Sequence, residues 1–175
     1  MRQRHLDPVD GFPPLIGRFV AMFVDTRRRL HRDLEDIGPS ELDEIPGWGE
    51  NSIGTLLYHL AAIELDWTFS DLLGAEEDGF PDGTDKWFPV DVREEDGKLS
   101  PVMEPLQHHL DRLEWVRSHL LNTLQAMSDA DLDRTFNEGR PDNTECGGAW
   151  VLHHLMQHEA EHRGQIGEIR VALRP

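Results

Sequence analysis

Apolar residues recur at spacings of three and four along four long stretches of the chain, which is the pattern of helices that bury one face. The first stretch lies between Pro13 and Gly38, and the second between Ser52 and Gly74. The third extends from about residue 103 to 127, and the fourth from about residue 148 almost to the end. The pattern therefore predicts an all-α fold, a four-helix bundle that forms one domain over residues 1–175.

The connections between these helices differ in length and composition. Residues 75–104 are acidic and contain glycine and proline but little periodicity, so we expect a long ordered loop between the second and third helices. The stretch SDADLDRTF, residues 128–136, predicts a short capped turn of helix. A polar loop through Gly139 and Pro141 then leads to the last helix.

The charge balance excludes one large class of partners. The chain carries 34 acidic and 17 basic residues, a formal net charge of −17, which repels the phosphates of nucleic acids. Arg27, Arg28 and Arg29 are adjacent, but acidic residues lie at helical spacing around them, so we expect a solvated, salt-bridged face. No stretch is apolar for long enough to cross a membrane, and no signal peptide is evident. We therefore expect a cytoplasmic protein that binds neither nucleic acid nor membranes.

The histidines are the main candidates for chemistry. The chain has ten of them and a single cysteine, Cys146, which excludes an internal disulfide and a thiolate zinc site. In HLMQHEAEHRGQI, residues 154–166, a helical wheel turns His158 and His162 toward the apolar stripe and leaves His154 outside it. Two imidazoles one turn apart can chelate one metal ion, whereas the same spacing also occurs in plain structural helices.

A third ligand must come from another helix, because His154 lies two turns, about 12 Å, from His162. His59 on the second helix and His109 on the third are near equals on geometry, and Glu64 and Asp66 are weaker oxygen candidates.

Four further residues are candidates for supporting the metal or touching a substrate. They are Gln165, Glu159, Arg163 and Trp67. Gly164 and Gly167 each cost helix stability, about 1 kcal/mol relative to alanine, and the close approach of a neighbouring helix is the simplest reason to tolerate them.

Two stretches carry a resemblance to a known family. SIGTLLYHLAAIELDW on the second helix and AWVLHHLMQHEAEHRGQIGEIR on the fourth resemble the DinB-like superfamily of helical-bundle metalloproteins. The resemblance implies that the third ligand is His59, which joins His158 and His162 around a divalent metal, zinc or nickel. Three neutral imidazoles leave the ion its full charge and an open position, as in catalytic sites.

The resemblance also implies an activity. Members of the superfamily include S-transferases that use mycothiol, bacillithiol or glutathione, so we expect this chain to transfer such a low-molecular-weight thiol to a small electrophile. Its partners would then be these two small molecules, and a homodimer is the assembly to test for. The alternatives are a non-catalytic, stress-related metal-binding bundle and a dimeric interaction module without metal.

Overall fold

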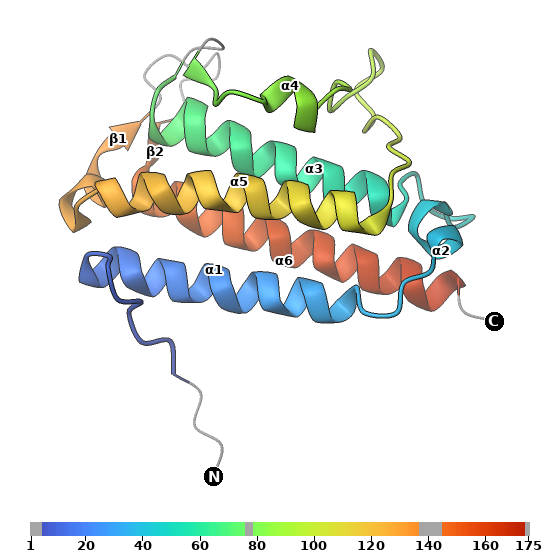
Figure 1. Ribbon diagram of the computed structural model, residues 1–175, viewed down its shortest axis with the longest axis horizontal. Coiled ribbons are helices and arrows are strands. Elements are labelled where there is room, and N and C mark those ends of the chain that lie inside the picture. The colour runs from blue at the N-terminus through green and yellow to red at the C-terminus, as the bar shows by residue number, and fades with distance from the viewer. Residues whose placement is uncertain (1–4, 76–78, 137–144, 174–175) are drawn as a thin grey trace.

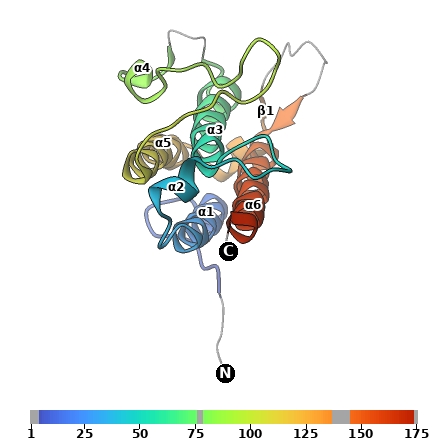
Figure 2. The ribbon, with the colours of Figure 1, turned by 90° about the vertical axis from the view of Figure 1, so that its right-hand side faces the viewer.

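The computed structural model describes residues 5–75, 79–136 and 145–173, and four long helices dominate it. They are α1 (Pro14–Asp33), α3 (Ile53–Asp66), α5 (Leu106–Ala126) and α6 (Gly148–Leu173), which run side by side along the molecule (Figure 1). Viewed from the end, they occupy the corners of a bundle (Figure 2). Helix α3 packs against α5 and α6, and α6 also packs against α1. The predicted all-α four-helix bundle is confirmed.

Short elements join the long helices. These are α2 (Pro39–Asp43), the π-helix η1 (Trp67–Leu72), α4 (Thr84–Trp87) and the 3₁₀-helix η3 (Asp129–Asp133). Strands β1 (Thr135–Phe136) and β2 (Cys146–Gly147) pair antiparallel. Residues 79–104 thus hold one short helix and an isolated bridge between Arg93 and Leu99. The polar loop predicted around Gly139 and Pro141 lies outside the described residues.

Helix starts are capped both by neighbouring residues and by a residue far along the chain. The Ser52 hydroxyl accepts a hydrogen bond from the Thr55 backbone nitrogen at 3.2 Å, which caps α3 as predicted. Helix α1 is capped from far along the chain, because the Asp129 carboxylate accepts hydrogen bonds from the backbone nitrogens of Leu15 and Ile16. The turn after α5 has the predicted cap, a capping box that Ser128 forms with Asp131.

Four details of the predicted helices are wrong. The first helix ends at Asp33, four residues before the end of its apolar pattern, and the third begins only at Leu106. The second helix changes from α to π geometry at Trp67 instead of continuing unbroken to Gly74. A Cβ atom at Gly164 or Gly167 would meet nothing within 4 Å, so close packing of a neighbouring helix does not explain these glycines.

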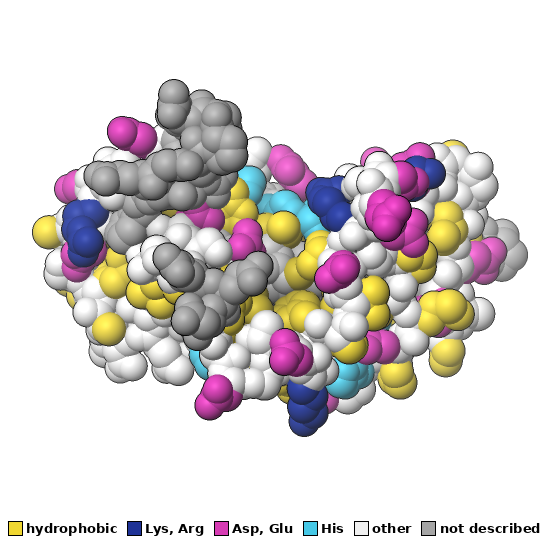
Figure 3. Space-filling model, turned by 90° about the horizontal axis from the view of Figure 1, so that it is seen from above, with side chains coloured by type: hydrophobic (Ala, Val, Ile, Leu, Met, Phe, Trp, Pro, Cys, Tyr) yellow, Lys and Arg dark blue, Asp and Glu magenta, His cyan; other side chains and the backbone are white. Residues whose placement is uncertain are grey.

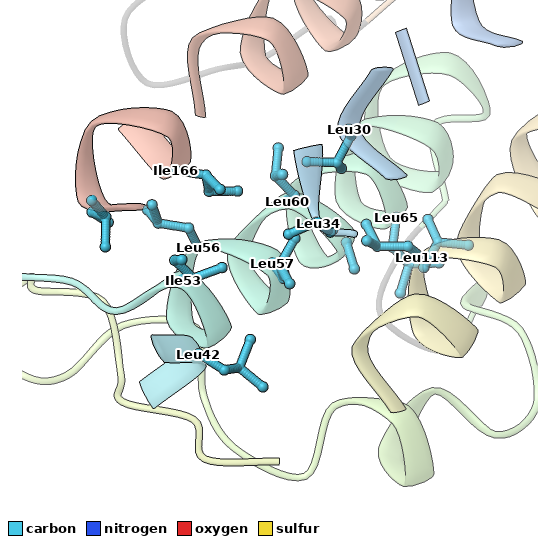
Figure 4. Packing of buried hydrophobic residues seen from close by; sticks show 13 residues of the cluster. Leu30, Leu34, Leu42, Ile53, Leu56, Leu57, Leu60, Leu65, Leu113 and Ile166 are labelled. Atoms are coloured by element: carbon cyan, nitrogen blue, oxygen red, sulfur yellow. The ribbon is translucent and has the colours of Figure 1, made fainter. Parts of the chain in front are cut away.

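Helix α3 is the central element of the bundle. Nearly all of its residues are buried, because α5 and α6 cover two of its sides and the segment after η1 covers a third. Leu56, Leu57 and Leu60 of α3 pack among leucines and isoleucines of the surrounding helices (Figure 4). This placement carries His59 of α3 into the interior, beside α6. None of the helices within the described ranges is both long and apolar enough to cross a bilayer.

Candidate metal centre

The structure brings His59, His158 and His162 together between α3 and α6. The Nε2 atom of His158 lies 3.1 Å from Nε2 of His59 and 3.0 Å from Nε2 of His162. One nitrogen from each ring lies within 4.8 Å of the other two. No other such group of three potential ligands occurs among the described residues. From above the bundle, histidine side chains are visible in a hollow of the surface with a basic side chain beside them (Figure 3).

Burial keeps the three imidazoles neutral. Burial, together with the charge of neighbouring histidines, lowers the pKa of His59 to about 4 and that of His158 to about 3. The positive charge of Arg93 adds to the effect on His59. Burial also lowers the pKa of His162. At neutral pH the cluster therefore offers nitrogen lone pairs and no positive charge of its own.

The hydrogen count at this cluster is short. Gln165 places its amide oxygen 2.8 Å from Nδ1 of His162, and since that oxygen only accepts, Nδ1 carries the hydrogen and Nε2 keeps a lone pair. Nε2 of His158 carries either a hydrogen or a lone pair. If it carries the hydrogen and donates to Nε2 of His162, it cannot also accept a hydrogen bond from His59. If it carries the lone pair and accepts from His59, its lone pair faces the lone pair of His162. At least one of these contacts between nitrogens thus lacks its own hydrogen.

A divalent metal ion fits this arrangement. Three nitrogens bound to one tetrahedral ion at 2.0–2.1 Å lie about 3.4 Å from one another, close to the observed contacts. The ion would replace the missing hydrogen with a positive charge, and the Gln165 contact already holds His162 in the tautomer that a metal requires. The fit is incomplete at His59, whose Nδ1 is buried without a hydrogen-bond partner among the described residues.

Comparison with known proteins gives the family. The sequence model of the DinB superfamily matches residues 22–166, most of the chain. The chain belongs to the DinB superfamily. A crystal structure of a conserved protein from Enterococcus faecalis shares the fold at a TM-score of 0.68, with 16% sequence identity, 89% of this chain covered and 94% of that chain. No curated protein matches the sequence.

The other predicted ligands of this DinB-superfamily chain lie elsewhere. His109 is fully buried on α5, where its Nδ1 lies 3.2 Å from an Arg112 nitrogen. Asp66 accepts a hydrogen bond from the Ser70 hydroxyl at the exposed side of α3. Glu64 lies within an ion-pair cluster in the core.

That cluster, here the Arg–Glu cluster, consists of one residue from each long helix: Arg27, Glu64, Arg117 and Glu159. All four are at most 6% exposed. Each arginine bonds both glutamates, at 2.8 and 3.0 Å from Arg27 and at 2.5 and 2.8 Å from Arg117. The expectation that Arg27 is solvated is therefore wrong, although Arg28 and Arg29 do pair with Asp25 at the surface.

The remaining predicted neighbours also differ in position. Both carboxylate oxygens of Glu159 bond arginines of the cluster, so this residue does not face the histidines as a general base. Arg163 lies 3.8 Å from the Asp33 carboxylate, at the end of α1. Trp67 packs on His154, with ring centroids 4.3 Å apart. Of the four, Gln165 is the residue whose side chain forms a hydrogen bond with one of the three histidines, His162.

Sequence reasoning missed Arg93. It follows a segment without readable periodicity, and nothing in that segment indicates that its charge reaches His59. A cavity of about 260 Å³ beside Gln165, lined in part by Trp48 and Leu56, was equally beyond prediction, because three separate segments form it.

Proposed function

We propose that this DinB-superfamily protein is a metal-dependent S-transferase, which joins a low-molecular-weight thiol such as mycothiol, bacillithiol or glutathione to a small electrophile. The convergence of three neutral imidazoles at Nε2 distances of 3.0 and 3.1 Å is the observation that carries the proposal. Such a ligand set leaves a divalent ion, zinc or nickel, with an open position for an exogenous ligand.

The chain's single cysteine does not belong to this site. This residue, Cys146, is buried in β2 and belongs to a different part of the fold. A bound divalent ion would lower the pKa of a thiol held at the site, which supplies the thiolate that the protein does not.

The protein's residues would then have distinct tasks. His59, His158 and His162 hold the ion, and Gln165 keeps the hydrogen of His162 on Nδ1, away from it. The positive charge of Arg93 near His59 favours an anionic group at the same place, in a chain that is otherwise strongly acidic.

The overall reaction balances with the two substrates alone. The thiol loses its proton to water, a sulfur–carbon bond forms, and the carbon–halogen bond of a halide, or the carbon–oxygen bond of an epoxide, breaks. A halide leaves to solvent, whereas an opened epoxide takes up a proton.

Two measurements test the proposal. Protein purified without a histidine tag is expected to retain close to one equivalent of a divalent metal after reconstitution, measured by elemental analysis. The loaded protein is then assayed with each thiol against a halogenated aromatic and an epoxide. A loaded protein that shows no metal-dependent rate with any thiol would be a passive metal binder. Less than about 0.2 equivalents of any metal would exclude both the S-transferase and the passive metal binder.

A further inference from the structure

A row of aromatic rings leads from the surface to the candidate metal centre. Trp150, His154, His158 and His162 follow one another on α6 at steps of four residues, so they lie on one face of the helix. Their successive ring centroids are 5.2, 5.9 and 4.4 Å apart. The first step is a parallel stack, with 2° between the planes of Trp150 and His154.

A second tryptophan from another element broadens the outer end of this row. Trp67, the first residue of the π-helix η1, has its ring centroid 4.3 Å from His154 and 5.5 Å from Trp150. We call Trp67, Trp150 and His154 the aromatic platform. The π-helix shifts the register of the chain after α3, which is one way in which functional side chains are re-aimed.

The outer end of the platform is open to solvent. Trp150 is 48% exposed, although a side chain of this size and apolarity gains most when it is buried. Exposure of a single apolar residue has no meaning by itself. Here the exposed ring lies in line with the histidines, and His154 is one helical turn, about 6 Å of rise, from His158.

We infer that the aromatic platform binds a flat aromatic ring of the electrophile, which it holds about one helical turn from the three histidines. This inference rests on the proposed function for the identity of the ligand, because the electrophile must lie next to the thiol that attacks it. Indole and imidazole faces favour offset stacking with another π-system over contact with a saturated ring of equal size. The platform thus selects aromatic over aliphatic electrophiles.

Binding can be measured without turnover. The unreactive probes 4-nitrobenzyl alcohol and cyclohexylmethanol are compared by the ¹H–¹⁵N signals of the indole groups, both in metal-free and in zinc-loaded protein. The chain has five tryptophans, so the signals can be assigned with single Trp→Phe variants. We expect the aromatic probe to shift the signals of Trp150 and Trp67 and the saturated probe to bind at least about fivefold more weakly.

Two variants and a matched control isolate the stacking contact. Trp150→Ala is expected to weaken binding of the aromatic probe about tenfold, and Trp150→Leu, which keeps an apolar side chain, nearly as much. Trp87→Ala is the control, because Trp87 also stacks on a histidine, His108 of α5, with centroids 5.2 Å apart. Arg112 donates a hydrogen bond to the backbone oxygen of Trp87, so the Trp87→Ala variant keeps this bond.

Different results overturn the two proposals. Equal binding of the two probes, or equal losses in Trp150→Ala and Trp87→Ala, would refute the platform, even in a protein that transfers thiols. Conversely, a platform that binds the aromatic probe as expected in a protein without thiol transfer would refute the proposed function and leave the aromatic site in place.

Discussion

Two polar clusters share helices α3 and α6 of this bundle, the Arg–Glu cluster in its core and the partly buried histidine centre, and they differ in whether they are complete. The Arg–Glu cluster contains two cations and two anions, and each arginine bonds both glutamates. Its spare hydrogens reach the backbone oxygens of Leu113 and Phe23. The histidine centre has only neutral groups, too few hydrogens for its contacts, and an unpartnered nitrogen on His59.

His158 and Glu159 are adjacent in sequence yet belong to these different clusters, because successive residues of a helix point about 100° apart. A buried cluster that satisfies itself needs no ligand and serves the fold. A cluster that does not satisfy itself indicates a place where a ligand can bind. The contrast yields four predictions, in order of decreasing effect.

The largest effect is expected from opening the Arg–Glu cluster. Glu159→Ala would leave the two arginines with a buried charge that Glu64 alone does not balance, so the free energy of unfolding should fall by about 3–5 kcal/mol. Urea denaturation of the metal-free protein measures the change. Glu161→Ala on the exposed face of the same helix, where the side chain bonds only Gln157 among the contacts described, should cost less than about 0.5 kcal/mol. Similar losses in both variants would mean that the cluster does not hold the bundle together.

The second prediction concerns metal and stability together. Zinc at about one hundred times its dissociation constant should raise the free energy of unfolding by about 2.7 kcal/mol, since a ligand of the native state stabilises by mass action. In His158→Ala this gain should vanish, whereas His109→Ala should keep it despite a lower starting stability, because His109 lies on α5 beside Arg112. A gain that disappears equally in both variants would contradict the assignment of the three histidines.

The sequence predicts the bundle well because its pattern is local. Apolar spacing marks all four long helices, Ser52 marks the start of α3, and the step from His158 to His162 marks a chelating pair. The choice of His59 over His109 does not follow from spacing, since both lie on the buried faces of their helices. It depends on which side of α3 meets α6, and the resemblance to the family supplied that information.

Other features could not be predicted because they depend on contacts between distant segments. Arg27 reads as one of three surface arginines until α3 and α6 bring Glu64 and Glu159 to it. Similarly, Asp129 caps α1 by accepting a hydrogen bond from Leu15, which lies 114 residues earlier in the chain. Periodicity identifies the buried face of a helix, but it does not identify which charged residues on that face will meet.

The third prediction uses pH to separate the clusters. Burial lowers the pKa of His109 to about 4, and the pKa values of His59 and His158 are also lowered, so the unfolded chain binds protons below about pH 6.5 that the native protein does not. Stability of the metal-free protein should therefore be full above pH 6.5 and fall as the pH is lowered toward 4. Burial raises the pKa of Glu64, but Arg117 and Arg27 hold it below its usual value, so its ion pairs persist in this range.

Denaturation by urea from pH 7.5 to 4.5 in the presence of a chelator measures this slope. Each such histidine contributes up to about 1.4 kcal/mol per pH unit, so His109→Gln should reduce the slope by about that amount. His153→Gln, at an exposed position of α6, should leave it unchanged. The same slope in the unchanged protein and in both variants would show that the pKa of His109 is not lowered in the native state.

The smallest effect is expected at Gln165, which connects the histidine centre to the surface of α6. Its amide oxygen lies 2.8 Å from Nδ1 of His162, and this bond selects the tautomer whose Nε2 faces His158. Gln165→Leu should weaken zinc binding about tenfold, as loss of such a supporting hydrogen bond usually does, without abolishing it. Competition with a fluorescent chelator measures the affinity. Gln165→Glu should restore it, because a carboxylate accepts the same hydrogen, whereas Glu168→Gln on the same helix should change nothing. If the Gln165→Leu variant binds zinc as tightly as the unchanged protein, the three histidines need no support from Gln165. The two clusters would then differ in charge alone.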